Sequence, residues 1–126
     1  MTETDYTEEV LAIIKVATEV HRVLGSGFLE AAYQEAMEIE ADFMDVPFVP
    51  QQNLQVQYKQ HRLKKKYVAD MICFDKIVVE FKVLDKLTDK EESQMLHYLK
   101  TSGYKVGVLI NFGSHPELEW KQFVDA

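Results

Sequence analysis

The first part of the chain carries apolar side chains at helical spacing. Apolar positions recur three or four residues apart between Thr7 and Leu24, which predicts an amphipathic helix over this range. Gly25-Ser26-Gly27 ends it, and a second helix is expected from about Phe28 to Met44. Pro47 and Pro50 then break the helical pattern. The apolar stripe expected on the second helix consists of Leu29, Ala32, Ala36, Ile39 and Phe43.

The middle of the chain changes to patterns typical of strands. Leu54, Val56 and Tyr58 alternate with polar residues, as in a half-buried strand. Two more continuously apolar strands are expected from Tyr67 to Phe74 and from Ile77 to Val83, because both segments are rich in β-branched or other apolar residues. The polar residues between these two strands then supply a turn.

A third helix and further strands are expected after this hairpin. Thr88 and Glu91 can form a capping box that opens the helix, and Gly103 suits its left-handed end. Tyr104 to Asn111 is the next expected strand, and the tail beyond Phe112-Gly113 predicts a final strand or a short helix that packs on the body. This order of elements indicates an α/β fold with a mixed central sheet flanked by helices.

Composition adds little to this picture. With 126 residues, of which 47% are hydrophobic and 28% charged, the chain is expected to form a single globular domain over residues 1–126. No apolar run is long enough to cross a membrane, and the acidic N-terminus lacks the order of a signal peptide, so a cytoplasmic location is expected. Cys73 lies in an apolar strand and is interpreted as a buried structural thiol.

The charges are distributed unevenly. A net charge of −7 argues against a protein that coats nucleic acid by bulk electrostatics. One short segment is nevertheless basic, and two interpretations stay open: a solvated hairpin tip or a local phosphate-binding rim. The basic residues of this segment are Lys59, His61, Arg62, Lys64, Lys65 and Lys66.

The most informative segment runs from Asp70 to Lys82. Side chains alternate along a strand, so Glu80 and Lys82 share one face of a strand that should be central and buried. Charges occupy such positions when they are paired or bind a metal. A two-residue loop between the strands would place Asp70 opposite Phe81, on the wrong face. A three-residue loop, Phe74-Asp75-Lys76, or a bulge would place Asp70 opposite Glu80.

Two facing carboxylates repel each other unless one is protonated or a cation lies between them. Oxygen ligands with open positions suit Mg²⁺ or Mn²⁺ and do not suit zinc. Lys82 could then orient or help to deprotonate a water that attacks a phosphodiester. The alternative is structural: Glu80 and Lys82 form a salt bridge on an edge strand, and Asp70 merely ends a strand.

Two further motifs decide the interpretation. Gly27 to Tyr33 reads G-x-x-E-x-x-Y, and Gln94 to Tyr98 reads Q-x-x-x-Y on the third expected helix. With these motifs the chain closely resembles the GxxExxY protein family, a branch of the PD-(D/E)xK nuclease superfamily related to RecB-type nucleases. The resemblance covers about Val20 to Phe123. Ser26 stands where the family usually has proline and Phe81 where leucine is common, and neither touches the proposed chemistry.

The resemblance implies an αβββαβ core and a catalytic site with a divalent cation, Mg²⁺ or Mn²⁺. Asp70 and Glu80 would be metal ligands and Lys82 the catalytic lysine. Glu30 would be an additional acid, and a further metal ligand, presented by the second helix. The alternative for Glu30 is a simple interaction with the N-terminal dipole of its helix.

Other residues are implied in supporting roles. Gln94 and Tyr98 lie one helical turn apart and would support the metal site or contact nucleic acid. We expect Gln94 and Glu30 to approach the same cleft from two helices. The alternative roles are structural: Gln94 would be exposed to solvent, and Tyr98 and Tyr33 would be core residues. Nucleic-acid contacts are also expected from Lys64, Lys65 and Lys66.

Two functions follow from these observations. The first is a metal-dependent nuclease, endo or exo, that hydrolyses phosphodiester bonds, above all in DNA. The second is a non-catalytic module that retains the fold and binds nucleic acid or a partner protein. The acidic charge favours the second, although a homodimer or a partner protein could supply the basic groove that a small nuclease needs.

Overall fold

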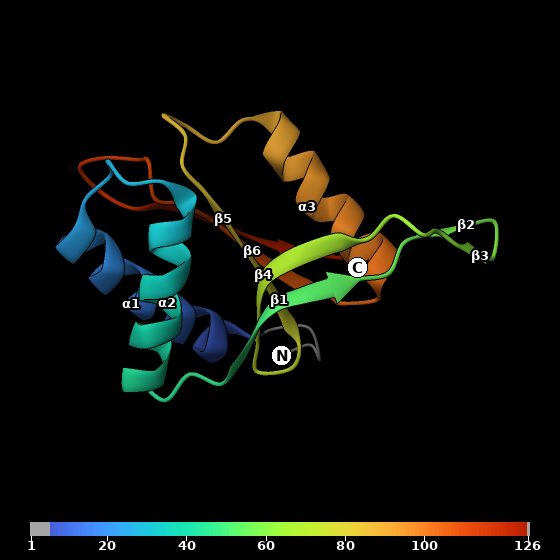
Figure 1. Cartoon of the computed structure of the whole chain (residues 1–126), viewed down its shortest axis with the longest axis horizontal. Coiled ribbons are helices and arrows are strands. Elements are labelled where there is room, and N and C mark those ends of the chain that lie inside the picture. The colour runs from blue at the N-terminus through green and yellow to red at the C-terminus, as the bar shows by residue number, and fades with distance from the viewer. Residues whose placement is uncertain (1–5, 126) are drawn as a thin grey trace.

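A five-stranded sheet forms the centre of the molecule in the computed structural model, which describes residues 6–125 (Figure 1). From one edge to the other, its strands are β1 (Phe48–Leu54), β4 (Tyr67–Cys73), β5 (Ile77–Lys82), β6 (Val106–Asn111) and β7 (Glu119–Val124). Strands β5 and β6 are parallel, and the other neighbours are antiparallel. The predicted mixed sheet is therefore confirmed, and the uncertain tail is a strand.

Helices cover both faces of this sheet. Helices α1 (Thr7–Leu24) and α2 (Glu30–Phe43) pack on one face, and α3 (Asp89–Ser102) packs on the other (Figure 1). Along β5, Val79 and Phe81 belong to the core beneath α1 and α2, whereas Val78 belongs to the core beneath α3. Alternation along the strand therefore turns Glu80 and Lys82 toward α3.

Local signals set the ends of two helices. The predicted range of α1 is confirmed at both ends. Helix α3 opens with the predicted capping box, in which Glu91 Oε1 accepts hydrogen bonds from Thr88 N at 2.7 Å and Thr88 Oγ1 at 2.8 Å. It closes at Gly103, whose φ of 84° is left-handed.

The predicted apolar stripe of α2 is wrong at three of its five positions, whereas Ala32 and Ala36 are half-buried. Leu29, Ile39 and Phe43 are 84%, 51% and 75% exposed, and the buried residues of this helix are Tyr33, Met37 and Ala41. A long-range contact fixes the rotation of the helix.

That contact is made by Tyr33, which is fully buried and confirms the core interpretation of this residue. Its hydroxyl donates to Gly25 O at 2.6 Å and accepts the Phe28 N–H at 3.2 Å. Its ring stacks on Phe112 with centroids 4.5 Å apart. These contacts leave the side chains of Leu29 and Phe43 outside the core.

The strand predicted across Leu54, Val56 and Tyr58 is also wrong. The chain instead forms β1 six residues earlier, through Pro50, and then a separate ribbon of β2 (Gln57–Tyr58) and β3 (His61–Arg62). Strand β1 is at an edge of the sheet and pairs only with β4, so a proline without an N–H is tolerated there.

Cys73 on β4 is buried, as expected for a structural cysteine. Burial raises the pKa of its thiol to about 12. Among residues 6–125, no helix has the length and apolar character needed to cross a bilayer.

Gly113, which follows β6, is tightly packed against the backbone of Leu84. A Cβ at this position would clash with the backbone of Leu84, including its carbonyl carbon at 2.9 Å. We expect Gly113→Ala to lower the free energy of unfolding by about 2 to 3 kcal/mol, as overpacking against backbone does. Urea denaturation measures this change. The control is Gly27→Ala, since a Cβ there meets nothing within 4 Å; an equal loss in both variants would contradict the clash.

Candidate active site

The β4–β5 hairpin brings two carboxylates together. Cys73 pairs with Ile77, so residues 74–76 form a three-residue loop. Continued along the hairpin, this register places Asp70 opposite Glu80. The three-residue alternative for the loop is therefore confirmed.

Asp70 is held by contacts from two directions. Its Oδ2 accepts the Phe81 N–H at 2.7 Å, and its carbonyl oxygen accepts a hydrogen bond from Gln34 Nε2 at 2.9 Å. The same amide of Gln34 donates to Glu38 Oε2 at 2.8 Å. Both the carboxylate and the backbone of Asp70 are thus fixed before any ligand binds.

Glu80 lies in the middle of the sheet and is 7% exposed. Burial raises the pKa of its carboxyl most, and the charge of Asp70 and a hydrogen bond shared with that residue raise the pKa further. Burial also raises the pKa of Asp70, against the opposing effect of the Phe81 N–H. The pair therefore holds a proton between its carboxyl groups in the absence of a cation.

The structural alternative for Glu80 does not hold. Strand β5 is a central strand, and no ion pair among residues 6–125 joins Glu80 to Lys82. Glu80 Oε1 is moreover buried without a hydrogen-bond partner in that part of the chain. An unpartnered buried carboxyl oxygen points to a ligand that binds there.

Lys82 and Glu30 complete the electrostatics of the site. The charge of Lys82 lowers the pKa of Asp70, of Glu80 and of Glu30, which places its ammonium group within reach of all three. Burial and the charge of Asp70 raise the pKa of Glu30. Glu30 and Asp70 also line one groove of about 500 Å³ between α2 and the sheet. The structure thus places Glu30 beside Asp70.

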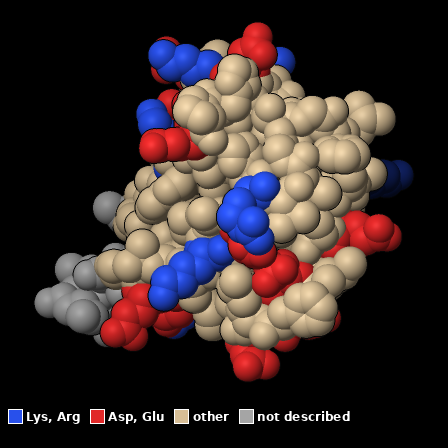
Figure 2. All heavy atoms as spheres, turned by 90° about the vertical axis from the view of Figure 1, so that its left-hand side faces the viewer, with Lys and Arg blue, Asp and Glu red and all other residues tan. Residues whose placement is uncertain are grey.

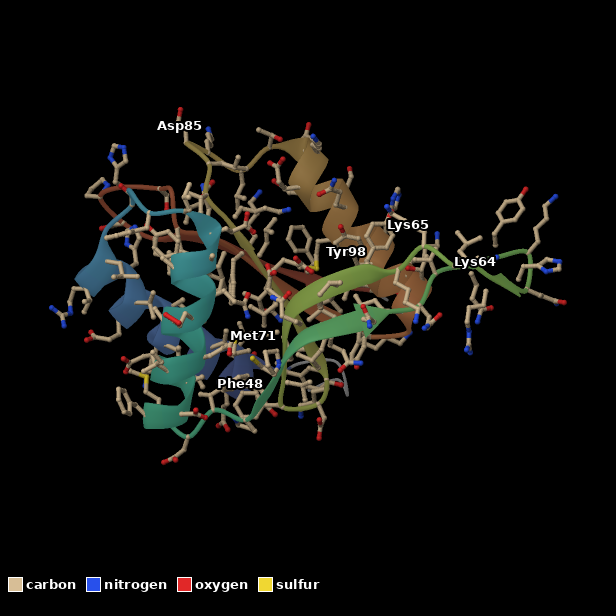
Figure 3. All side chains as sticks on the ribbon, viewed as in Figure 1. Phe48, Lys64, Lys65, Met71, Asp85 and Tyr98 are labelled. Atoms are coloured by element: carbon tan, nitrogen blue, oxygen red, sulfur yellow. The ribbon has the colours of Figure 1, made fainter. Side chains whose placement is uncertain are left out.

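Helix α3 faces the carboxylates from the other side. Burial raises the pKa of Tyr98 most, and the charges of Glu80 and Asp70 add to this. Its ring lies 4.6 Å from that of Tyr67 on β4, and Figure 3 shows Tyr98 between α3 and that strand. Gln94 is half-buried one turn earlier on the same helix face. Among residues 6–125, no hydrogen bond or ion pair joins Gln94 to the carboxylates, so its role stays a prediction.

The three lysines 64–66 lie apart from this site. They are exposed in the connection from β3 to β4, before the strand that carries Asp70. They are not at the tip of the ribbon, which Lys59 and Gln60 form between β2 and β3. The structure does not bring them to the carboxylate pair.

Comparison with known proteins fits this geometry. A family model described as the PD-(D/E)XK nuclease superfamily matches residues 7–123. The chain belongs to this superfamily. Its branch, GxxExxY or RecB-like, stays a prediction. No curated protein matches the chain.

One solved structure has a fold similar to that of this protein. The crystal structure of SSO0001 is similar with a TM-score of 0.55 and 14% sequence identity, over 90% of this chain. The chain spans 61% of the length of SSO0001. At this identity the likeness concerns the fold alone.

Nucleases of this superfamily typically use divalent metals, and the residues present can be tested for such an ion. Among residues 6–125, no three His, Cys, Asp or Glu side chains are placed to hold a metal together. Asp70 and Glu80 nevertheless offer oxygen donors, and the unpartnered Glu80 Oε1 is one of them. This donor set fits Mg²⁺ or Mn²⁺, which keep several waters. Glu30 as a third ligand stays a prediction.

Two residues that support the candidate site were given no role in the predictions from sequence. Gln34, which fixes Asp70, lies four residues after Glu30 and four before Glu38, so helical spacing was an available signal. Asn111 lies beside Lys82 on the parallel strand β6, and no role was predicted for it.

Asn111 fixes the chain that follows Lys82. It is fully buried, and its Oδ1 accepts the N–H groups of Leu84 at 2.9 Å and Gly113 at 3.1 Å. Its Nδ2 donates to Glu119 Oε1 at 2.9 Å. The ends of β5, β6 and β7 are thereby tied together behind the lysine.

Proposed function

We propose that this protein is a metal-dependent nuclease that hydrolyses phosphodiester bonds in DNA. One observation carries the proposal: Asp70 and Glu80 face each other beside Lys82, with a buried oxygen of Glu80 lacking a partner. Membership of the nuclease superfamily implies a nucleic-acid substrate and supports this chemistry.

Each charged residue of the site would have a separate role in the hydrolysis. Asp70 and Glu80 would hold Mg²⁺ or Mn²⁺, which when bound would polarise the phosphoryl group and lower the pKa of a coordinated water. Glu80 must release its proton for this. The Lys82 ammonium would orient the attacking water and stabilise the negative charge that develops on the phosphate oxygens. The Phe81 N–H keeps the Asp70 carboxylate in place meanwhile.

A cleavage assay tests this proposal. The parent protein is incubated with duplex DNA, single-stranded DNA, a DNA junction and RNA, each with Mg²⁺, Mn²⁺ or EDTA. We expect metal-dependent cleavage of at least one DNA substrate. A parent protein that is inert toward every substrate with both metals would contradict the nuclease proposal.

Metal binding should be visible without any substrate. If the dissociation constant is about 1 mM, about 10 mM Mg²⁺ adds about 1.4 kcal/mol to the free energy of unfolding and raises the melting temperature by about 4 to 6 °C. Asp70→Asn should remove this shift, because it removes a ligand charge. The control is Asp85→Asn, in the exposed loop after β5 (Figure 3). An unchanged shift in Asp70→Asn would exclude Asp70 as a ligand.

The net charge of −7 favours a second candidate, a non-catalytic module that binds nucleic acid or a partner protein. This module would show no metal-dependent cleavage. Its binding of nucleic acid would depend on the exposed lysines 64–66 and would be indifferent to Lys82. A second copy of the chain or a partner protein could add positive surface in either case.

A further inference from the structure

A short ribbon projects from the sheet, and we name residues 55–66 the β2–β3 arm (Figure 1). Gln57 pairs with Arg62 and Tyr58 with His61, and Leu63 N donates to Val56 O at 2.9 Å. Residues 59 and 60 make the turn with φ values of 48° and 71°, as in the tight turns that match the twist of a hairpin. The arm therefore has a defined backbone.

The arm is the basic part of an acidic molecule. Residues 46–69 contain five Lys or Arg and no acid, so the rest of the chain, with nine basic and 21 acidic residues, carries −12. On the opposite side of the molecule, the face of α1 and α2 carries acidic side chains together with several Lys and Arg side chains (Figure 2). The arm thus gathers its basic residues in a stretch of the sequence without acids. The five basic residues of the arm are Lys59, Arg62, Lys64, Lys65 and Lys66.

These cations are available to a ligand. All five are exposed, and no ion pair among residues 6–125 uses any of them. Phosphodiester oxygens are the partners that such a row of Lys and Arg side chains neutralises. The carboxylate pair, by contrast, repels a polyanion until a cation is bound.

We propose that the β2–β3 arm binds the phosphate backbone of the nucleic acid at a distance from the bond that the active site cleaves. The inference rests on the proposed nuclease function for the identity of the ligand. It adds a separate binding surface, which needs no divalent cation and directs an acidic protein to its substrate.

The fold sets the spacing between arm and site. Lys66 and Lys64 precede Asp70 by four and six residues along the chain that enters β4. Extended chain covers about 3.3 Å per residue and Lys64 lies at a bend, so these lysines lie at most about 13 to 20 Å from Asp70. Duplex DNA rises about 3.4 Å per base pair, so the arm would contact phosphates within about six base pairs of the scissile bond. Figure 3 shows Lys64 and Lys65 well away from Met71, the neighbour of Asp70.

Binding measured in EDTA tests the arm independently of cleavage. Fluorescence anisotropy with a labelled DNA duplex of about 24 base pairs follows the affinity between about 50 and 200 mM salt. The arm variant carries Lys64→Ala, Lys65→Ala and Lys66→Ala. The control variant loses the same charge elsewhere on the surface through Lys15→Ala, Lys100→Ala and Lys105→Ala, which are all exposed.

We expect the arm variant to bind at least about tenfold more weakly, and its slope of log affinity against log salt to fall by about 2.7, which is three phosphate contacts. The control variant should stay within about twofold of the parent. The same measurement is made with an RNA duplex, because its backbone offers the same phosphates. Thermal unfolding checks that both variants are folded.

Two results would overturn the proposal. Equal weakening in the two triple variants would mean that net charge alone governs binding. A parent protein that binds no duplex in EDTA would show that the arm has no affinity for the backbone. Neither result decides the nuclease proposal, which the metal-dependent cleavage assay tests separately.

Discussion

Replacing Lys82 with alanine should lower metal-dependent cleavage by about 100- to 1,000-fold, the usual effect of removing one group that stabilises transition-state charge. The ammonium group acts on the carboxylates of Asp70 and Glu80 through space and is not itself a ligand of a cation. The Mg²⁺-dependent rise in melting temperature should therefore persist. Rates with saturating substrate and melting curves of the same samples give both measurements.

Lys86→Ala is the matched control, since it removes a lysine from the exposed loop just after β5. It should cleave like the parent. If Lys82→Ala keeps the parental rate, Lys82 has no part in the chemistry. If it loses both the rate and the metal-dependent shift, its role is structural.

Without a divalent cation, the parent protein should lose stability as the pH rises from about 5 to about 8. The pKa of Glu80 is raised in the folded protein, mainly by burial, above the ordinary value of about 4.3 that applies to the unfolded chain. The folded state then binds more protons than the unfolded state in this interval. Each pH unit therefore costs about 1.4 kcal/mol of unfolding free energy from this one group, and the cost vanishes below about pH 4.

Glu80→Gln should flatten this dependence, because the amide can donate to Asp70 as the protonated carboxyl does and does not ionise. At about pH 8 the variant should be about 2 to 4 kcal/mol more stable than the parent in EDTA. Urea denaturation at several pH values measures both proteins. Parallel curves for parent and variant would show that Glu80 is ionised in the folded protein.

The features that sequence predicted well are decided by neighbours in the chain. The capping box of α3 needs only Thr88 and Glu91, which are three residues apart. The alternation of Glu80 and Lys82 follows from strand geometry, and placing Asp70 opposite Glu80 needed only the length of one loop. Such relations between residues close together in the chain can be predicted from the sequence alone.

The features that sequence missed depend on distant contacts. The buried face of α2 is set by Tyr33, which stacks on Phe112 from the other end of the chain. Helical periodicity alone could not separate this face from that of Leu29 and Phe43. No strand was predicted through Pro50, yet β1 forms there because β4 supplies an edge to pair with. Asn111 is buried for the same long-range reason, since its partners come from three different strand ends.

The length of the three-residue loop between β4 and β5 determines on which face of the sheet Asp70 lies. Side chains alternate with a period of two, so losing or gaining one loop residue would turn Asp70 toward the opposite face of the sheet. Among homologous chains, active members should therefore keep this loop at a constant length. Insertions and deletions should instead gather in the turn at Lys59 and Gln60, where a change of length leaves Asp70 and Glu80 facing each other.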